Sequence, residues 1–269
     1  MKGVALAGIG LVSGWGEGLS ALPEEASSAA AGRLSVAAEL PAPAGERFRR
    51  ATRECLLGVG AVEALLGEVG LARAALAGED TALIYVTAGA YGAANREFIE
   101  AAATAGAIHF PYTAPSAVPA EVAIEFGIRG RYVILLGGAT TMIEALAQAA
   151  ILLNRRTCER ALVLAVETFA ECQDLYARAR WLLKPPLVEA AACALLVPGG
   201  GRLAVKDVGA ESPREGEVRR RAGETFACAP LIALALARAG GDEPLTLTGQ
   251  WGGRRLELTW HAAGAGAVA

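Results

Sequence analysis

The segment from Tyr132 to Ala147 constrains the fold more than any other part of this 269-residue chain. A short apolar run, Tyr132–Leu136, ends in Gly137-Gly138-Ala139, and a helical pattern starts at Thr140. We expect a strand that turns sharply into a helix. Enzymes place nucleophiles on such turns, because the corner exposes one side chain and the helix N-terminus offers N–H groups to an anion. Here Ala139 stands at the apex, and a methyl group is not a nucleophile.

Composition favours a globular protein that works without nucleic acid. Hydrophobic residues make up 54% of the chain, the net charge is −3 and the sequence pI is about 5.6. This hydrophobic content supports a large core, and neither charge value favours nucleic-acid binding. Because no apolar run approaches the roughly 18–20 residues that a membrane span needs, we expect no membrane span.

Cysteine and histidine usage indicates a reduced protein without metal. The five cysteines are scattered and form no CxxC, which is typical of a cytoplasmic protein. Cys55, Cys193 and Cys228 stand in apolar surroundings and are expected to be buried. His109 and His261 are the only histidines, too few for a transition-metal site. The glycine-bearing segments around residues 7–10 and 88–92 lack a complete dinucleotide fingerprint, so no cofactor is expected.

Hydrophobic patterning predicts alternating strands and helices up to Pro198. Predicted strands cover residues 4–12, 81–87, 133–136, 159–166 and 189–197, and predicted helices cover 50–66, 95–103, 119–126 and 140–153. This alternation favours an α/β layered domain with a largely parallel sheet.

After Pro198 the pattern changes to shorter elements. We expect a strand at 203–208, a charged loop at 211–221, a helix at 229–239, and a hairpin of 245–248 with 256–260.

Several motifs resemble the β-ketoacyl synthases of the thiolase-like fold. GIRGRYVILLGGATTMIEALAQA is similar to their active-site segment, and VALAGIGLVSGWG and TALIYVTAGAYG are similar to their first two strands. Glu167 in ALVLAVET and Glu189 in VEAAACALLV match two family acids, although the glycines around them are missing.

The catalytic positions of that family are lost. The reactive Cys lies nine residues after the second Gly of the G-x-x-G, which leads from Gly130 to Ala139. The family's Lys-x-x-x-Gly-His signature is matched by RRRAGETFACAP, which places Arg219 at the Lys position and Glu224 at the His position. No His-Gly-Thr motif is present. The closing GFGG hairpin survives as QWGG, Gln250–Gly253.

The resemblance implies an α/β, thiolase-like layered fold with a complete first half and a reduced second half. Residues 1–198 would form the ketosynthase N-terminal-like half. Residues 199–269 would form a truncated C-terminal half packed on it as one structural unit. The shortened, Cys-less members of the family act as chain-length-factor-like subunits.

The same resemblance implies partners. We expect an active β-ketoacyl synthase in a heterodimer, or a second copy in a homodimer, and an acyl carrier protein. The pathway would be fatty-acid, aryl-polyene or polyketide-type biosynthesis. Two further hypotheses remain open: a stand-alone acyl-thioester decarboxylase or hydrolase that uses the degenerate pocket, and a homodimeric scaffold that binds the carrier protein.

Each candidate site residue has two alternative interpretations, one functional and one structural. Thr140 and Thr141 would be hydroxyl nucleophiles or helix N-caps, and capping is the commoner use of Thr at a helix start. Trp251, Gly252 and Gly253 would line a pocket or acyl tunnel, or cover the edge of the core.

The charged residues and the cysteines also have alternative interpretations. Glu224 would face the former active site, where burial raises a carboxyl pKa, or end a solvated loop beside Arg219. Cys172 and Cys193 lack a neighbouring His that would activate them. The arginines 178, 180 and 219–221 would meet an acidic carrier protein or lie in solvent.

Overall fold

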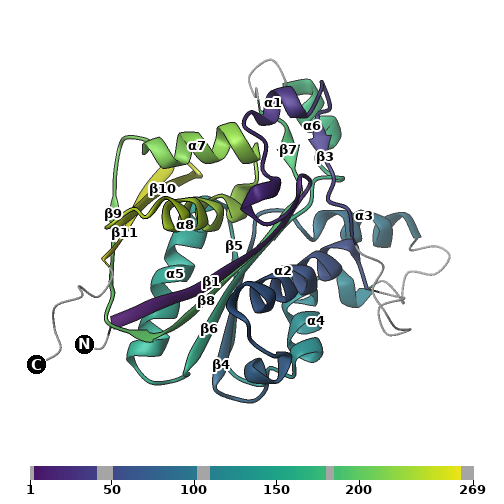
Figure 1. Ribbon diagram of the computed structural model, residues 1–269. Coiled ribbons are helices and arrows are strands. Elements are labelled where there is room, and N and C mark those ends of the chain that lie inside the picture. Colours follow the sequence, from purple (N-terminus) through teal and green to yellow (C-terminus); the bar gives the residue numbers. More distant parts are fainter. Residues whose placement is uncertain (1–2, 41–50, 102–109, 180–184, 262–269) are drawn as a thin grey trace, which may run out of the picture.

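Two β-sheets with helices between them organise the chain in this computed structural model, which describes residues 3–40, 51–101, 110–179 and 185–261 (Figure 1). The larger sheet has the order β2 (Gly16–Glu17), β1 (Gly3–Ser13), β8 (Ala190–Gly199), β6 (Arg160–Glu167), β4 (Thr81–Thr87) and β5 (Tyr132–Leu136). The smaller sheet has the order β10 (Leu245–Trp251), β11 (Arg254–His261) and β9 (Arg202–Asp207). A short parallel pair joins β3 (Ser35–Val36) to β7 (Leu187–Val188).

Helices fill the space between the sheets and cover one outer side. The α-helices are α1 (Ala26–Ala29), α2 (Arg53–Val69), α3 (Gly92–Ala101), α4 (Ala117–Phe126), α5 (Ala139–Asn154), α6 (Gln173–Ala179), α7 (Pro213–Ala222) and α8 (Ala229–Gly240). Short 3₁₀ helices are η1 (Leu19–Ala21), η3 (Arg73–Leu76), η5 (Phe110–Tyr112) and η6 (Phe226–Cys228). The mixed α/β architecture agrees with the fold class predicted from the sequence.

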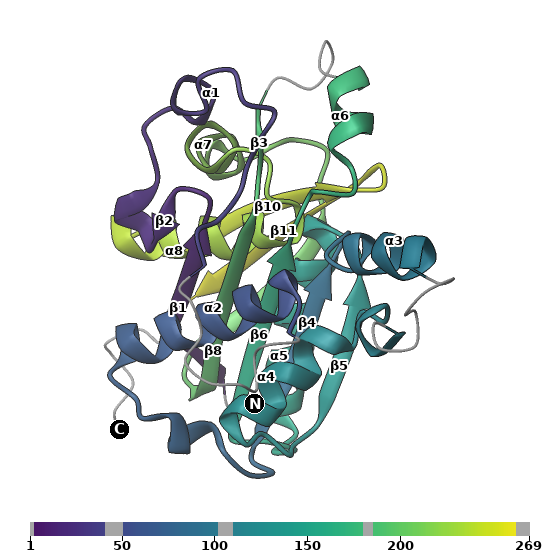
Figure 2. The same ribbon diagram turned by 90° about the vertical axis from the view of Figure 1, so that its right-hand side faces the viewer.

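The larger sheet is buried on both faces. Helices α2 and α4 cover one face, and α5 and α8 lie on the other, between the two sheets (Figures 1 and 2). All seven residues of β4 are buried as a result. Strand β4 runs parallel to both of its neighbours, β5 and β6, whereas β8 runs antiparallel to β1 and β6. Strand β2 is also antiparallel to β1, so β1, β6, β4 and β5 run in one direction and β2 and β8 run in the other.

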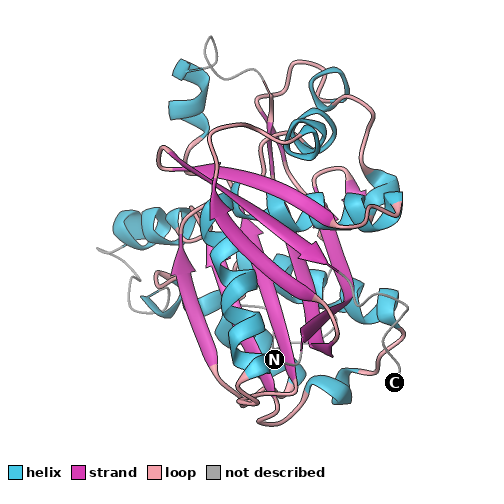
Figure 3. Cartoon of the chain, turned by 90° about the vertical axis from the view of Figure 1, so that its left-hand side faces the viewer, coloured by secondary structure: helices cyan, strands magenta, loops and turns pink. Residues whose placement is uncertain are grey.

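The smaller sheet repeats part of this topology. Strand β11 lies between β10 and β9 and is antiparallel to both, just as β8 lies between β6 and β1. Helix α8 precedes β10 in the chain as α5 precedes β6. Strands β4 and β5 have no counterpart in the smaller sheet as far as the structure describes the chain. Figure 3 shows the outer face of this sheet turned to the viewer, without a helix over it.

The charged loop predicted at 211–221 is wrong, because these residues form helix α7. The Ser212 hydroxyl accepts a hydrogen bond from the Glu215 N–H at 3.2 Å, and Pro213 occupies the first turn. A polar N-cap followed by Pro is a strong helix start even when the helix itself is rich in charge. Arg219 then pairs with Glu215 one turn earlier, which stabilises the helix further.

Candidate functional site

The predicted strand-to-helix corner is present at the end of β5. Strand β5 ends at Leu136, Gly138 is the N-cap, and α5 begins at Ala139. A Cβ at Gly137 would overlap the Thr141 side chain, and a Cβ at Gly138 would overlap the Trp251 ring. Both glycines are therefore needed for close packing, the first against the helix and the second against β10.

Ala139 lies at the apex of this corner and is covered by the smaller sheet. Its exposed fraction is 7%, and a Cβ added to Gly249 of β10 would lie 2.8 Å from the Ala139 Cβ. The position thus has neither a nucleophilic atom nor room for a larger neighbour. The corner retains the geometry of a nucleophile site without its chemistry.

The two threonines after Ala139 do not cap the helix. Gly138 is the N-cap and no side chain accepts a capping hydrogen bond there, so the capping prediction is wrong. Thr140 is buried and Thr141 is half-buried, both in the first turn of α5. The tight contact of Thr141 with Gly137 places its hydroxyl against the backbone of the corner.

A chain of three aromatic rings closes over the corner. Trp251 lies 5.3 Å from Phe226, and Phe226 lies 5.1 Å from Phe169, in edge-to-face arrangements measured between ring centroids. Aromatic pairs of this geometry contribute stability beyond their area burial. Phe226 adopts a φ of 45°, which a non-glycine residue rarely does. Gly252 and Gly253 take positive φ in the turn that carries Trp251 back into β11.

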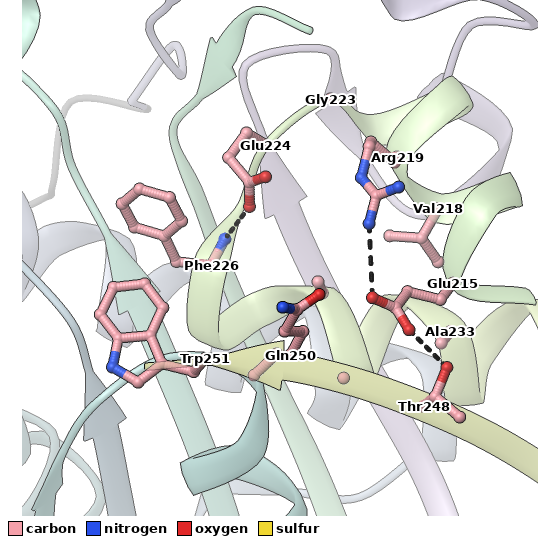
Figure 4. Close-up of a pocket in the computed structure, with 13 residues that line it drawn as sticks. Glu215, Val218, Arg219, Gly223, Glu224, Phe226, Ala233, Thr248, Gln250 and Trp251 are labelled. Atoms are coloured by element: carbon pink, nitrogen blue, oxygen red, sulfur yellow. Dashed lines mark hydrogen bonds and ion pairs between the residues drawn. The ribbon is translucent and has the colours of Figure 1, made fainter. Parts of the chain in front are cut away.

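Behind these rings lies a cavity of about 210 Å³ that also contacts Ala139 (Figure 4). Its lining residues come from α7, the segment before η6, α8 and β10: Glu215, Val218, Arg219, Gly223, Glu224, Phe226, Ala229, Ala233, Thr248, Gly249, Gln250 and Trp251. Of the residues singled out from sequence, the structure gathers Ala139, Arg219, Glu224, Gln250 and Trp251 around this cavity, whereas Thr140 and Thr141 are not in its lining. Gly252 and Gly253 lie beside it in the hairpin turn, outside its lining.

Glu224, which the sequence resemblance matched to the family's His position, is half-buried and lines this cavity. It accepts a hydrogen bond from the Phe226 N–H at 3.2 Å. Burial raises its pKa, an effect that the Phe226 N–H and the nearby Arg219 charge oppose. A raised pKa makes a carboxyl a stronger base than an ordinary one, so Glu224 is the candidate acid or base of this cavity.

The other polar groups of the cavity satisfy one another. The Glu215 carboxylate accepts from the Thr248 hydroxyl at 2.5 Å and pairs with Arg219 at 3.3 Å. Arg219 also pairs with Glu211 at 3.0 Å. The neighbouring Arg220 donates to the Glu24 carbonyl oxygen, and Arg221 donates to carbonyl oxygens of the segment before α1. The arginines of α7 are therefore engaged within the protein.

The acid Glu167, at the end of β6, is fully buried and links the segment after β4 to η6. Its carboxylate accepts from the N–H groups of Ala88 at 2.7 Å, Gly89 at 3.1 Å and Ala227 at 3.3 Å. Burial raises its pKa to about 8 despite these donors. Sequence reasoning matched Glu167 to a family acid and missed this role, because Ala227 is 60 residues away along the chain.

The remaining candidates do not assemble a catalytic group. Burial raises the pKa of Cys172 to about 11 and that of Cys193 still further, so both thiols are protonated at neutral pH and neither is an activated nucleophile. His261 lies exposed at the end of β11, and His109 and Arg180 fall outside the described residues. Within the described ranges, no group of three His, Cys, Asp or Glu side chains is placed to hold a metal. None of the described helices is both long and apolar enough to cross a membrane.

Sequence comparison and structural comparison give different results. No protein-family model and no curated protein sequence matches the chain. Solved structures do match, over nearly the whole chain. One is the complex AntDE:AntF, a type II polyketide synthase acyl-carrier protein with its ketosynthase. It matches at a TM-score of 0.74, with 14% identity over 97% of this chain and 99% of that chain.

Two further structures extend the comparison. A β-ketoacyl synthase from Burkholderia phymatum matches at a TM-score of 0.69, with 14% identity over 97% of this chain and all of the other. A ketosynthase in complex with its chain length factor, from Xenorhabdus doucetiae, matches at 0.64 with the same identity and coverage. The chain therefore has the thiolase-like fold that ketosynthases and chain length factors share.

Proposed function

We propose that the chain is a catalytically inactive, chain-length-factor-like subunit that pairs with an active β-ketoacyl synthase. The observation that carries this proposal is the corner at Ala139, which keeps the fold's nucleophile geometry while β10 and Trp251 cover an inert methyl group. A subunit without a nucleophile contributes to condensation only by shaping a partner that has one.

An open sheet edge supports the pairing. Strand β5 is the last strand of the larger sheet and has a strand partner on one side only, among the residues that the structure describes (Figure 2). Tyr132 is 60% exposed and Leu136 is 57% exposed, and Ile124 of α4 is 65% exposed. Because side chains alternate along a strand, Tyr132 and Leu136 share the face of Ile134, which packs on the α2 and α4 side. Unpaired backbone beside apolar side chains is a surface that accepts another strand.

The proposed partner is a Cys-bearing ketosynthase whose own edge strand continues this sheet. A heterodimer and a homodimer would use the same edge. The two halves of the proposed unit, 1–198 and 199–269, would then both serve the complex: the first supplies β5 and the second closes the subunit's own corner. An acyl carrier protein would deliver substrate for fatty-acid, aryl-polyene or polyketide-type synthesis.

The test is native mass spectrometry after co-expression with each Cys-bearing ketosynthase of the source organism. We expect a one-to-one complex that Leu136→Asp abolishes, because a charge would have to be buried at the paired edge. Val205→Asp, on an exposed apolar residue of β9, is the matched control and should leave the complex intact. A chain that stays monomeric at micromolar concentration with every ketosynthase would refute the proposal.

Inactivity has its own test. In Ala139→Cys, the thiol would lie under Gly249, so we expect iodoacetamide to modify the folded variant at least tenfold more slowly than the unfolded one. We also expect no condensation of acyl and malonyl carrier protein. Condensing activity in this variant, without a partner, would show that the corner is open and that Ala139 alone disables it.

One observation favours a second candidate function, a decarboxylase or hydrolase acting on acyl thioesters. Glu224 is half-buried, has a raised pKa and lines the same cavity as Ala139. Release of CO₂ from malonyl carrier protein by the isolated chain, lost in Glu224→Gln and kept in the surface control Glu257→Gln, would support it. Absence of turnover would remove it, and carrier binding by a homodimer without turnover would favour the scaffold hypothesis.

A further inference from the structure

Most arginines of the described residues are held by other groups of the protein. Ion pairs bind those at 53, 73, 214, 219, 221, 238, 254 and 255, and backbone carbonyl oxygens accept from those at 33, 96 and 220. The arginines at 129, 131, 155, 156, 160, 178 and 202 make neither kind of contact within the described ranges. All of these except Arg178 come from one end of the larger sheet.

Backbone hydrogen bonds bring the chain segments of this end together. The Arg129 N–H donates to the Gly78 carbonyl at 2.8 Å, and the Arg160 N–H donates to the Asp80 carbonyl at 3.1 Å. The segment that precedes β4 therefore lies between the segments that precede β5 and β6. Two strand spacings separate Arg131 from Arg160, which is about 10 Å.

The last turn of α5 and the start of β9 reach the same end. A groove at this end is lined by Leu153 and Asn154 of α5, by residues 156–159 after it, and by Gly3, Asp80 and Pro198. Arg202 follows Gly201, whose carbonyl accepts from the Val4 N–H at 2.8 Å. We call this surface the arginine end, defined by Arg129, Arg131, Arg155, Arg156, Arg160 and Arg202.

Charge and exposure distinguish the arginine end from the rest of the molecule. Its arginines are exposed, apart from the half-buried Arg160. The acidic side chains there are Glu79, Asp80 and Glu159, so positive charge is in excess, although the whole chain carries a net charge of −3. Helix C-termini favour cations, which accounts for Arg155 and Arg156 but leaves Arg129, Arg131 and Arg202 without a structural role.

We propose that the arginine end is a docking surface for a protein partner that presents clustered Asp and Glu side chains. Arginine binds carboxylates through two parallel hydrogen bonds, which favours it over lysine for such recognition. The interspersed Glu79, Asp80 and Glu159 favour a protein, because a phosphate polyanion or an anionic membrane would meet these acids with uniform negative charge.

The site is separate from the proposed pairing surface. Strands β4, β5 and β6 begin at the arginine end and run away from it, and the corner at Ala139 follows the far end of β5. An acidic partner docked here would leave the corner and the exposed Leu136 free. The proposal therefore does not depend on the proposed function.

The test uses a fluorescein-labelled helical peptide with glutamates along one face, and a control peptide in which glutamine replaces each glutamate. We expect the glutamate peptide to bind the full chain, and its affinity to fall at least tenfold between about 50 and 300 mM salt. The variant Arg129→Glu/Arg160→Glu should weaken binding at least tenfold at the lower salt concentration. Arg178→Glu, an exposed and unpaired arginine elsewhere on the surface, should leave binding unchanged.

Hydrogen exchange locates the contact and guards against misfolded variants. We expect the glutamate peptide to protect amides in segments 78–81, 128–131 and 157–160 of the unmodified chain. Equal binding of the glutamine peptide, unchanged binding by the double variant, or protection elsewhere would overturn the proposal. Binding to phosphatidylglycerol vesicles or duplex DNA in place of the glutamate peptide would overturn it as well.

Discussion

The two sheets of this protein bury their residues in different ways. Strand β4 of the larger sheet, TALIYVT, is buried along its whole length because helices cover both faces. Strand β11 of the smaller sheet, RRLELTWH, alternates: Leu256, Leu258 and Trp260 are buried, and the residues between them are half-buried. Its outer face carries polar groups such as the Lys206–Glu257 ion pair, at 2.8 Å.

This difference shows what each sheet does for the site. The larger sheet positions the corner through β5 and α5, and its continuous apolar strands make that frame rigid. The smaller sheet needs only its inner face, which supplies Gly249 and Trp251 to cover Ala139. An antiparallel sheet with a polar outer face is stable with helices on one side only.

The largest expected difference between the two sheets is in the unfolding free energy that is lost when side chains are truncated to Ala. In β4, neighbouring Leu83 and Ile84 belong to the two core clusters on opposite faces, so changing either one to Ala should cost about 2–5 kcal/mol of unfolding free energy. In β11, Leu258→Ala should cost a similar amount, but the adjacent Thr259→Ala should stay within about 0.5 kcal/mol. Urea denaturation measures all four, and a large loss in Thr259→Ala would contradict a polar outer face.

The contact between the sheets is tested by a double-mutant cycle at Gly138 and Trp251. Gly138→Ala should destabilise the fold by about 1–3 kcal/mol, since the new Cβ overlaps the Trp251 ring. In a Trp251→Ala background the same change should cost much less, because the ring is gone. Chemical denaturation gives the coupling free energy, and additive effects would show that the two residues do not pack together.

The buried acid Glu167, which links the segment after β4 to η6, should make stability depend on pH. Its pKa is about 8 in the folded protein against an ordinary value of 4.5, so the folded state holds a proton that the unfolded chain releases. Stability from this group is complete below about pH 4.5 and is lost as the pH rises through 8, at no more than about 1.4 kcal/mol per pH unit.

Glu167→Gln should flatten this slope, as measured by denaturation between pH 5 and 8.5. Glu171, whose burial raises its pKa to about 7, contributes in the same direction and explains any slope that remains. Glu257→Gln on the outer face is the control and should keep the slope of the unmodified protein. An unchanged slope in Glu167→Gln would mean that Glu167 is ionised in the folded state at these pH values.

The smallest effect is expected on the outer face itself. Removing the Lys206–Glu257 ion pair by Glu257→Gln should change the unfolding free energy by no more than about 1 kcal/mol, because Lys206 is well exposed. The change should shrink further at high salt, where such a pair is screened. A loss that persists in 1 M salt would indicate that this face is covered.

Local patterns predicted most elements of the larger sheet from the sequence. The strand at 81–87 has the observed bounds, and the turn from Leu136 to Ala139 lies where glycines and a helical pattern placed it. The failures came from short-range polar contacts. Ser212 and Pro213 start a helix that charge density had suggested was a loop, and Gly138 rather than a threonine caps α5.

The covering of the corner at Ala139 was not predictable from local sequence patterns, because its contacts join segments that are distant in the sequence. Gly249 meets Ala139, Trp251 meets Gly138, and Glu167 binds the Ala227 N–H across 60 residues. No periodicity marks such partners. The φ of 45° at Phe226 likewise depends on Trp251 and Phe169 around it, since Phe has no intrinsic preference for that conformation.

By itself, the sequence determined that no thiol or hydroxyl stands at the apex of the corner, because that is a property of residue 139 alone. It also determined the alternation of buried strands and helices, since burial follows local hydrophobic pattern. Only the tertiary structure decided that position 139 is covered, that Glu224 lines the same cavity, and that β5 pairs on one side only among the described residues. Those properties arise from the packing of one sheet on the other, and packing depends on all the residues in contact at once.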